Sequence, residues 1–62
     1  MKSQYDEVAD VLYVSVREIK EGEVDTTIEI KEDILLDFDK DKRLIGIEIL
    51  HPTNKDLGLW LN

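Results

Sequence analysis

The chain has 62 residues, no cysteine and one histidine, and its 15 acidic residues outnumber its 8 basic ones to give a net charge of −7. Its length fits a single domain over residues 1–62, and the lack of cysteine excludes disulfides and thiolate zinc sites. The acidic balance, with no basic stripe, argues against nucleic acid as a partner. No apolar stretch has the length of a signal peptide or a membrane span, so we expect a cytoplasmic protein with no membrane association.

Apolar and polar residues alternate with a period of two along most of the chain, which is typical of half-buried β-strands. A short first strand is expected to end near Tyr5, followed by a turn from Asp6 to Asp10. Four more alternating segments cover residues 11–17, 24–30, 33–39 and 43–50. Their separators, KEGE, KE and DKDK, are short and polar, as in antiparallel hairpins. We therefore predict a mostly β fold, an antiparallel β-meander of four to five strands.

The pattern changes after His51, because Pro52 cannot donate to a strand ladder and so ends the last strand. The segment TNKDLGLWL predicts a short C-terminal helix, with Thr53 as its N-cap and Gly58 limiting its length. Trp60 would either anchor this tail on the sheet or contact a partner.

Several apolar residues fall on the face of the predicted strands that the main core does not use. The interface candidates are Val11, Tyr13, Leu35, Leu44 and Leu50, together with Trp60. Each large aliphatic side chain left in water forgoes about 1.5–3 kcal/mol of burial, so something is expected to cover them. We expect a homo-oligomer, with a dimer as the first choice, or a protein partner, for which the negative charge favours a basic one.

Residues 37–48, DFDKDKRLIGIE, approach the spacing of a helix-flanked calcium loop. Asp37, Asp39, Asp41 and Glu48 occupy its first, third, fifth and last ligand positions. The sixth position is Lys42 where that loop needs glycine, and the flanks read as strands. We interpret the segment as a hairpin turn whose aspartates cap their own backbone, and we predict no metal and no cofactor. Asp37, Asp39 and Asp41 remain candidates for weak cation association.

No side chain is predicted to be catalytic. Ser3 lies near the N-terminus, Ser15 lies within a strand, and His51 is a strand-terminal histidine beside a proline. A pocket of the size enzymes use is hard to build in so short a chain, so we predict that the protein is not an enzyme. The alternative to an interaction module is a small-ligand or metal site assembled between subunits from Asp6, Asp10, Glu48 and His51.

Two segments, YDEVADVLYVSV and ILLDFDKDKRLIGIEIL, resemble the opening and closing motifs of the prokaryotic family of unknown function DUF2283. The matching residues are Tyr5, Asp6, Ala9, Asp10, Leu12 and Tyr13, then Asp37, Asp39, Leu44, Gly46, Ile47, Glu48, Ile49 and Leu50. The resemblance covers nearly the whole chain and implies a small, stand-alone, β-rich protein without an assigned activity. The resemblance also implies that this acidic chain acts as the antitoxin-like partner of a small basic protein. The LGLWLN end departs from the family pattern, so the resemblance assigns no role to Trp60.

Overall fold

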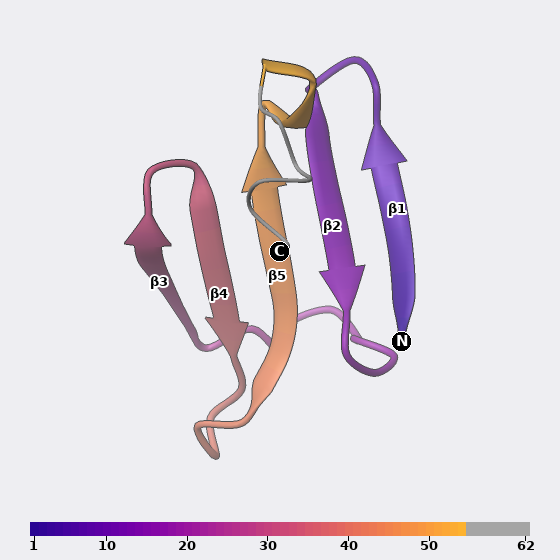
Figure 1. The fold of residues 1–62 in the computed structure, drawn as a ribbon. Coiled ribbons are helices and arrows are strands. Elements are labelled where there is room, and N and C mark those ends of the chain that lie inside the picture. The colour runs from indigo at the N-terminus through magenta and orange to yellow at the C-terminus, as the bar shows by residue number, and fades with distance from the viewer. Residues whose placement is uncertain (55–62) are drawn as a thin grey trace.

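The structure, a computed structural model, describes residues 1–54, which form five β-strands (Figure 1). The strands are β1 (Lys2–Asp6), β2 (Val11–Ser15), β3 (Thr26–Lys31), β4 (Ile34–Phe38) and β5 (Leu44–Leu50). They make one antiparallel sheet in the order β1-β2-β5-β4-β3. The prediction of a mostly β, antiparallel fold is confirmed, and the N-terminal segment supplies the fifth strand.

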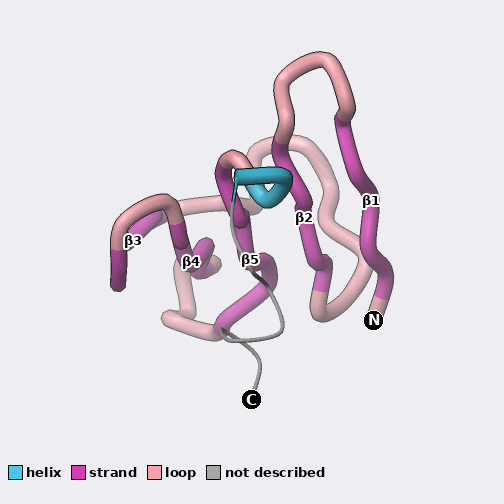
Figure 2. Tube along the Cα trace, turned by 45° about the horizontal axis from the view of Figure 1, so that its top comes forward, coloured by secondary structure: helices cyan, strands magenta, loops and turns pink. Residues whose placement is uncertain are grey.

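The strand order differs from the continuous meander predicted from the sequence, which is therefore wrong in this respect. β1 and β2 form a hairpin, and β3, β4 and β5 form a meander, but β2 pairs with β5 and not with β3. The connection over residues 16–25 runs behind the lower ends of β5 and β4 and reaches β3 at the far edge (Figures 1 and 2). Its ten residues exceed a tight hairpin loop, and alternation identifies strands without specifying which strands are neighbours.

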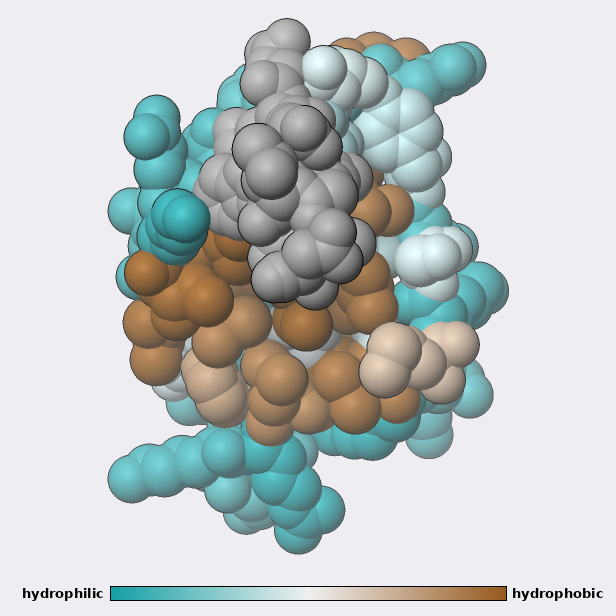
Figure 3. Space-filling view, in the orientation of Figure 1, coloured by the Kyte–Doolittle hydropathy of each residue, from teal (hydrophilic) through white to brown (hydrophobic). Residues whose placement is uncertain are grey.

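One face of the sheet is apolar, as the brown surface in Figure 3 shows. The cross-strand register places Leu12 beside Ile49, and Ile47 between Val14 and Leu36. We define this apolar face as Leu12, Val14, Ile28, Ile34, Leu36, Phe38, Ile45, Ile47 and Ile49. None of these residues is charged, and Ile45 is the only one that is fully buried. Within residues 1–54, the main core is therefore one face of a single sheet.

A β-bulge changes the face on which Leu44 lies. The register between β4 and β5 shifts after Asp37 pairs with Gly46, so that Phe38 pairs with Leu44 and the β5 strand gains one residue. Because a shift of one residue reverses the face, Leu44 lies opposite Phe38 of the apolar face and is 37% exposed. The prediction that Leu44 shares the second face with Leu50 is wrong for this reason.

The two edges of the sheet are β1 and β3, and every residue in both strands is exposed. β3 differs from β1 because it exposes two isoleucines, Ile28 at 47% and Ile30 at 58%. A register shift between Glu29 and Lys31 ends the regular pairing of β3 with β4 near Ile30. The apolar face therefore continues to the open edge of the sheet at β3.

The described residues contain no α-helix, so the predicted short C-terminal helix is not supported there. β5 is followed at Pro52–Asn54 by a single 3-10 turn, and Pro52 is buried. The remainder of the predicted helix, including Gly58 and Trp60, lies outside the described residues. Within residues 1–54 there is also no helix of the length and apolar character needed to cross a bilayer.

Candidate functional site

The second face of the sheet carries polar side chains at its centre. The register places Tyr13 of β2 beside Glu48 of β5, and Glu48 beside Leu35 of β4. In the next row, Gly46 of β5 lies beside Asp37 of β4. Three central strands therefore bring a phenol and two carboxyl groups close together over one glycine.

Asp37 is the buried acceptor of this group. The residue is only 3% exposed, and the Tyr13 hydroxyl donates to its Oδ2 over 2.8 Å. The Thr27 hydroxyl donates to Oδ1 over 2.7 Å, from the neighbouring strand β3. A buried carboxylate is tolerated when hydrogen bonds replace its hydration, and here each oxygen has a donor. We call Tyr13, Thr27, Asp37 and Glu48 the polar cluster.

Gly46 provides the space that the Tyr13 ring occupies. A Cβ atom added at Gly46 would overlap the Tyr13 hydroxyl and lie 2.6 Å from Cζ of the ring. Glycine within a strand is unfavourable unless another group must approach the backbone closely, as happens here. The glycine therefore lets Tyr13 reach across β5 to Asp37.

The environment of the polar cluster favours protonated groups. Burial raises the pKa of the Glu48 carboxyl above its usual range, and a hydrogen bond with Asp37 and the charge of Asp37 add to this effect. Burial also raises the pKa of the Tyr13 phenol, again with a hydrogen bond to Asp37 as the next cause. Burial and the neighbouring Asp37 carboxyl therefore shift both the Tyr13 phenol and the Glu48 carboxyl toward their protonated forms.

The remaining interface candidates in the described part lie around this cluster. Val11 is paired with Leu50, and Leu35 with Glu48, so these three aliphatic residues share the second face with Tyr13. All of them are half-buried. Trp60 lies outside the described residues.

Asp39 organises the β4–β5 turn. This agrees with the interpretation of the segment as a hairpin turn whose aspartates cap their own backbone. The Oδ1 atom of Asp39 accepts the backbone N–H groups of Asp41 and Arg43, each over 2.9 Å. Its Oδ2 lies 3.2 Å from the guanidinium of Arg17, which also contacts Glu23 at 3.1 Å. The backbone N–H of Arg43 is the largest cause that lowers the pKa of the Asp39 carboxyl, and Asp41 and Arg17 contribute further. The turn therefore satisfies this carboxylate with groups of its own chain.

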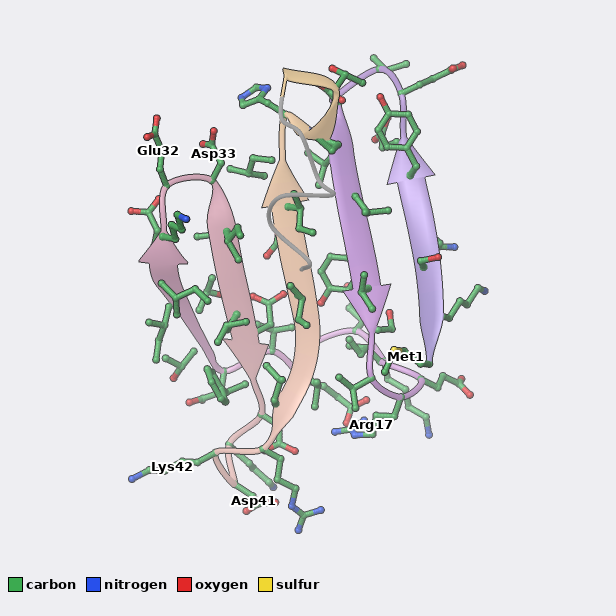
Figure 4. All side chains as sticks on the ribbon, in the orientation of Figure 1. Met1, Arg17, Glu32, Asp33, Asp41 and Lys42 are labelled. Carbon is green, nitrogen blue, oxygen red and sulfur yellow. The ribbon has the colours of Figure 1, made fainter. Side chains whose placement is uncertain are left out.

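The three candidate cation ligands point to different surroundings. Asp37 lies in the polar cluster, Asp39 caps the turn, and Asp41 points away from the sheet at its lower end (Figure 4). Arg43 approaches Asp41 at 3.9 Å. Glu48, the last ligand position of the calcium-like spacing, lies far along β5 beside Tyr13. In residues 1–54 no group of three or more acidic or histidine side chains is placed to hold a metal ion.

Asp10 joins three segments at the upper end of the sheet. Its side chain accepts hydrogen bonds from the hydroxyl groups of Tyr5 over 2.8 Å and Thr53 over 2.6 Å. Its carbonyl accepts the His51 backbone N–H over 2.8 Å. The Thr53 hydrogen bond is the main cause that lowers the pKa of the Asp10 carboxyl. Asp10 therefore links the first hairpin to the end of β5 and the 3-10 turn.

The four residues of the alternative ligand site are divided between two places within one chain. Asp6 accepts the backbone N–H groups of Val8 and Ala9 and so caps the first turn. Asp10 and His51 lie at the same end of the sheet, whereas Glu48 belongs to the polar cluster. A single copy therefore does not gather these side chains into one site.

Sequence reasoning missed two of the contacts described above. Thr27 falls within the alternating segment over residues 24–30, where the pattern does not mark it as a donor, yet it donates to Asp37. Arg17 was assigned to a strand end, yet it bridges Asp39 and Glu23 from the connection behind the sheet. Gly46 within an apolar alternating segment was the available signal for a close approach.

Comparison with known proteins identifies one family. The family model described as "Protein of unknown function (DUF2283)" matches residues 2–51, which include all five strands and the polar cluster. No curated protein and no solved structure matches the chain. Because the match covers most of the 62 residues, the chain belongs to the DUF2283 family.

Proposed function

We propose that this protein is a non-enzymatic, cytoplasmic protein-interaction module that uses the apolar face of its sheet, open at β3, to bind another polypeptide. The observation that supports the proposal is the exposure of this face at its β3 end. Ile28 of the face and the adjacent Ile30 are about half exposed, whereas the other residues of the face are half-buried or, at Ile45, fully buried. Full burial of an exposed large aliphatic side chain is worth about 1.5–3 kcal/mol, so covering a half-exposed isoleucine gains about half as much, and a partner gains free energy from each one it covers.

The distribution of charge supports the same surface. The nine residues that define the apolar face carry no charge, Lys31 lies at its margin opposite Ile34, and Glu29, Asp37 and Glu48 lie on the second face. A contact made through the apolar face therefore leaves these carboxylates out of the interface, where unpaired charges would cost free energy.

The polar cluster supports a structural role over a catalytic one. Both Asp37 oxygens already accept hydrogen bonds from Tyr13 and Thr27. Asp39 and Asp10 are likewise held by groups of the same chain. Acidic groups used in this way stabilise turns and strand pairs, and none of them needs a substrate to explain its position.

Native mass spectrometry of the protein recovered gently from its own host tests the proposal. A homo-oligomer, or a second chain at fixed stoichiometry, is the expected result. The proposal is refuted if the chain stays a bare monomer from micromolar to millimolar concentration and carries no second chain.

Two variants of β3 locate the surface. Ile28→Lys places a charge on the apolar face and is expected to weaken the assembly. Glu29→Lys introduces the same residue one position away on the second face and is the matched control, which is expected to leave the assembly intact. Equal effects of the two substitutions would show that the apolar face is not the contact surface.

A further inference from the structure

We propose that the partner of the open edge is a second copy of this chain, paired antiparallel through β3 about a two-fold axis beside Ile28. This inference rests on the proposed function, because it names the occupant of the β3 edge, where the apolar face ends. It starts from the position of β3 at the edge of the sheet, with all six residues exposed. An edge strand presents unpaired backbone groups along its outer side, which are a template for another strand.

The composition of the two edges favours β3 over β1. β3 reads TTIEIK, rich in the β-branched residues that strands prefer, and its two isoleucines are about half exposed. β1 reads KSQYD and has no aliphatic residue. Pairing at β3 therefore joins apolar surface to apolar surface, whereas pairing at β1 does not.

The register of the self-pairing follows from the side chains of β3. With the axis beside Ile28, Ile28 lies opposite Ile28 of the second copy, and Thr27 lies opposite its Glu29. Thr26 then lies opposite Ile30 of the second copy. No like charges face each other among these pairs, and apolar side chains meet apolar or β-branched ones.

The neighbouring registers are worse. An axis beside Glu29 places two glutamates directly opposite each other, and an axis beside Thr27 places Glu29 opposite Asp25. An axis beside Ile30 places Ile28 opposite Glu32. An axis that passes between two residues would place the apolar face of one copy on the same side of the joined sheet as the second face of the other, because the side-chain period is two. The pattern thus selects one register, which makes the apolar faces of the two copies continuous.

A charge-exchange experiment tests this register in purified full-length protein by analytical ultracentrifugation. Ile28→Lys and Ile28→Glu each place like charges across the two-fold axis, and each is expected to raise the dimer dissociation constant by about tenfold or more. An equimolar mixture is expected to recover dimer as a mixed pair, since lysine then faces glutamate. Recovery on mixing also shows that both variants are folded. Gln4→Lys, on the opposite edge, is the matched control and is expected to dimerise like the unaltered chain.

Amide hydrogen exchange on the unaltered chain distinguishes edge pairing from stacking of two faces. The amides of residues 26–29 that point away from β4 are expected to exchange more slowly as concentration rises, and residues 3–5 of β1 are expected not to change. Added salt is expected to strengthen the dimer, because each copy carries a net charge of −7.

A dimer whose β3 amides exchange at the same rate at all concentrations would overturn this inference and leave the proposed function standing. Three other results would also overturn this inference and leave the proposed function standing. They are a dimer that both Ile28 variants leave intact, folded variants that form no dimer when mixed, and a monomer that holds a different chain at fixed stoichiometry. A bare monomer without any partner would overturn both proposals.

Discussion

Replacement of Tyr13 by phenylalanine is expected to destabilise the protein much more than the same replacement of Tyr5. Both tyrosines donate to an aspartate over 2.8 Å, but the acceptor of Tyr13 is Asp37, which is 3% exposed, whereas the contact of Tyr5 with Asp10 lies at the surface. A hydrogen bond to a buried charged group is worth about 1.5–3 kcal/mol, because its loss leaves the charge without compensation. A core of this size supplies only about 3–5 kcal/mol in all.

Urea denaturation followed by circular dichroism measures the difference. With a slope of about 1 kcal/mol/M for so small a chain, the midpoint of Tyr13→Phe is expected to fall by about 1.5 M or more. Tyr5→Phe is the matched control, since it removes the same hydroxyl group from an exposed pair. Equal shifts of the two midpoints, or no shift for Tyr13→Phe, would refute the argument that burial of Asp37 sets the strength of this contact.

Three further predictions concern Gly46, Glu48 and the aspartate-rich turn. Gly46→Ala is expected to lower the free energy of unfolding by about 1–3 kcal/mol, because the added Cβ overlaps Tyr13. In a Tyr13→Ala background the same substitution is expected to cost far less. Equal costs in both backgrounds, measured by urea denaturation, would contradict the steric cause. The raised pKa of Glu48 means that its contribution to stability is present below its usual value of 4.5 and is lost as pH rises through the raised value. Glu48→Gln is therefore expected to raise the urea midpoint more at pH 7 than at pH 4, and a larger gain at pH 4 would show that the sign is wrong. Calcium titrated to about 5 mM is expected to cause no common, saturable shift of the backbone amide NMR signals of residues 37–48. The reason is that Asp39 already accepts hydrogen bonds from its own turn. A common saturable transition would reveal a specific site.

Alternation of apolar residues was enough to predict the strands but not their order. The segments around Leu12, Leu36 and Ile47 each show a period of two over several residues, and all three are strands of the sheet. Neither that period nor the length of residues 16–25 states that β5 enters between β2 and β4. Leu44 was assigned to the wrong face because a bulge adds one residue to β5, and a bulge leaves no clear trace in the pattern.

The polar cluster was predictable only in part. Asp37 and Glu48 were singled out for their spacing along the chain, yet what relates them in the fold is the pairing of β4 with β5. Tyr13 reaches Asp37 across 24 positions of sequence, and Thr27 reaches it across 10. Contacts of this kind depend on strand order, so they could not be derived before the order was known. The caps of Asp6 and Asp39 are local to their turns, and local contacts of this kind can be predicted from aspartate in a turn.

The central position of β5 has a consequence for the synthesis of the chain. β5 is the last of the described strands to leave the ribosome, yet it forms the only ladder between the β1–β2 hairpin and the β3–β4 hairpin in the described part. A nascent chain that stops before Leu44 holds two hairpins without a shared core, and isolated hairpins are at best marginally stable in water. The sheet therefore assembles only after translation has passed residue 50, so folding is late and all-or-none, and until then β2 and β4 each present an unpaired edge to other chains.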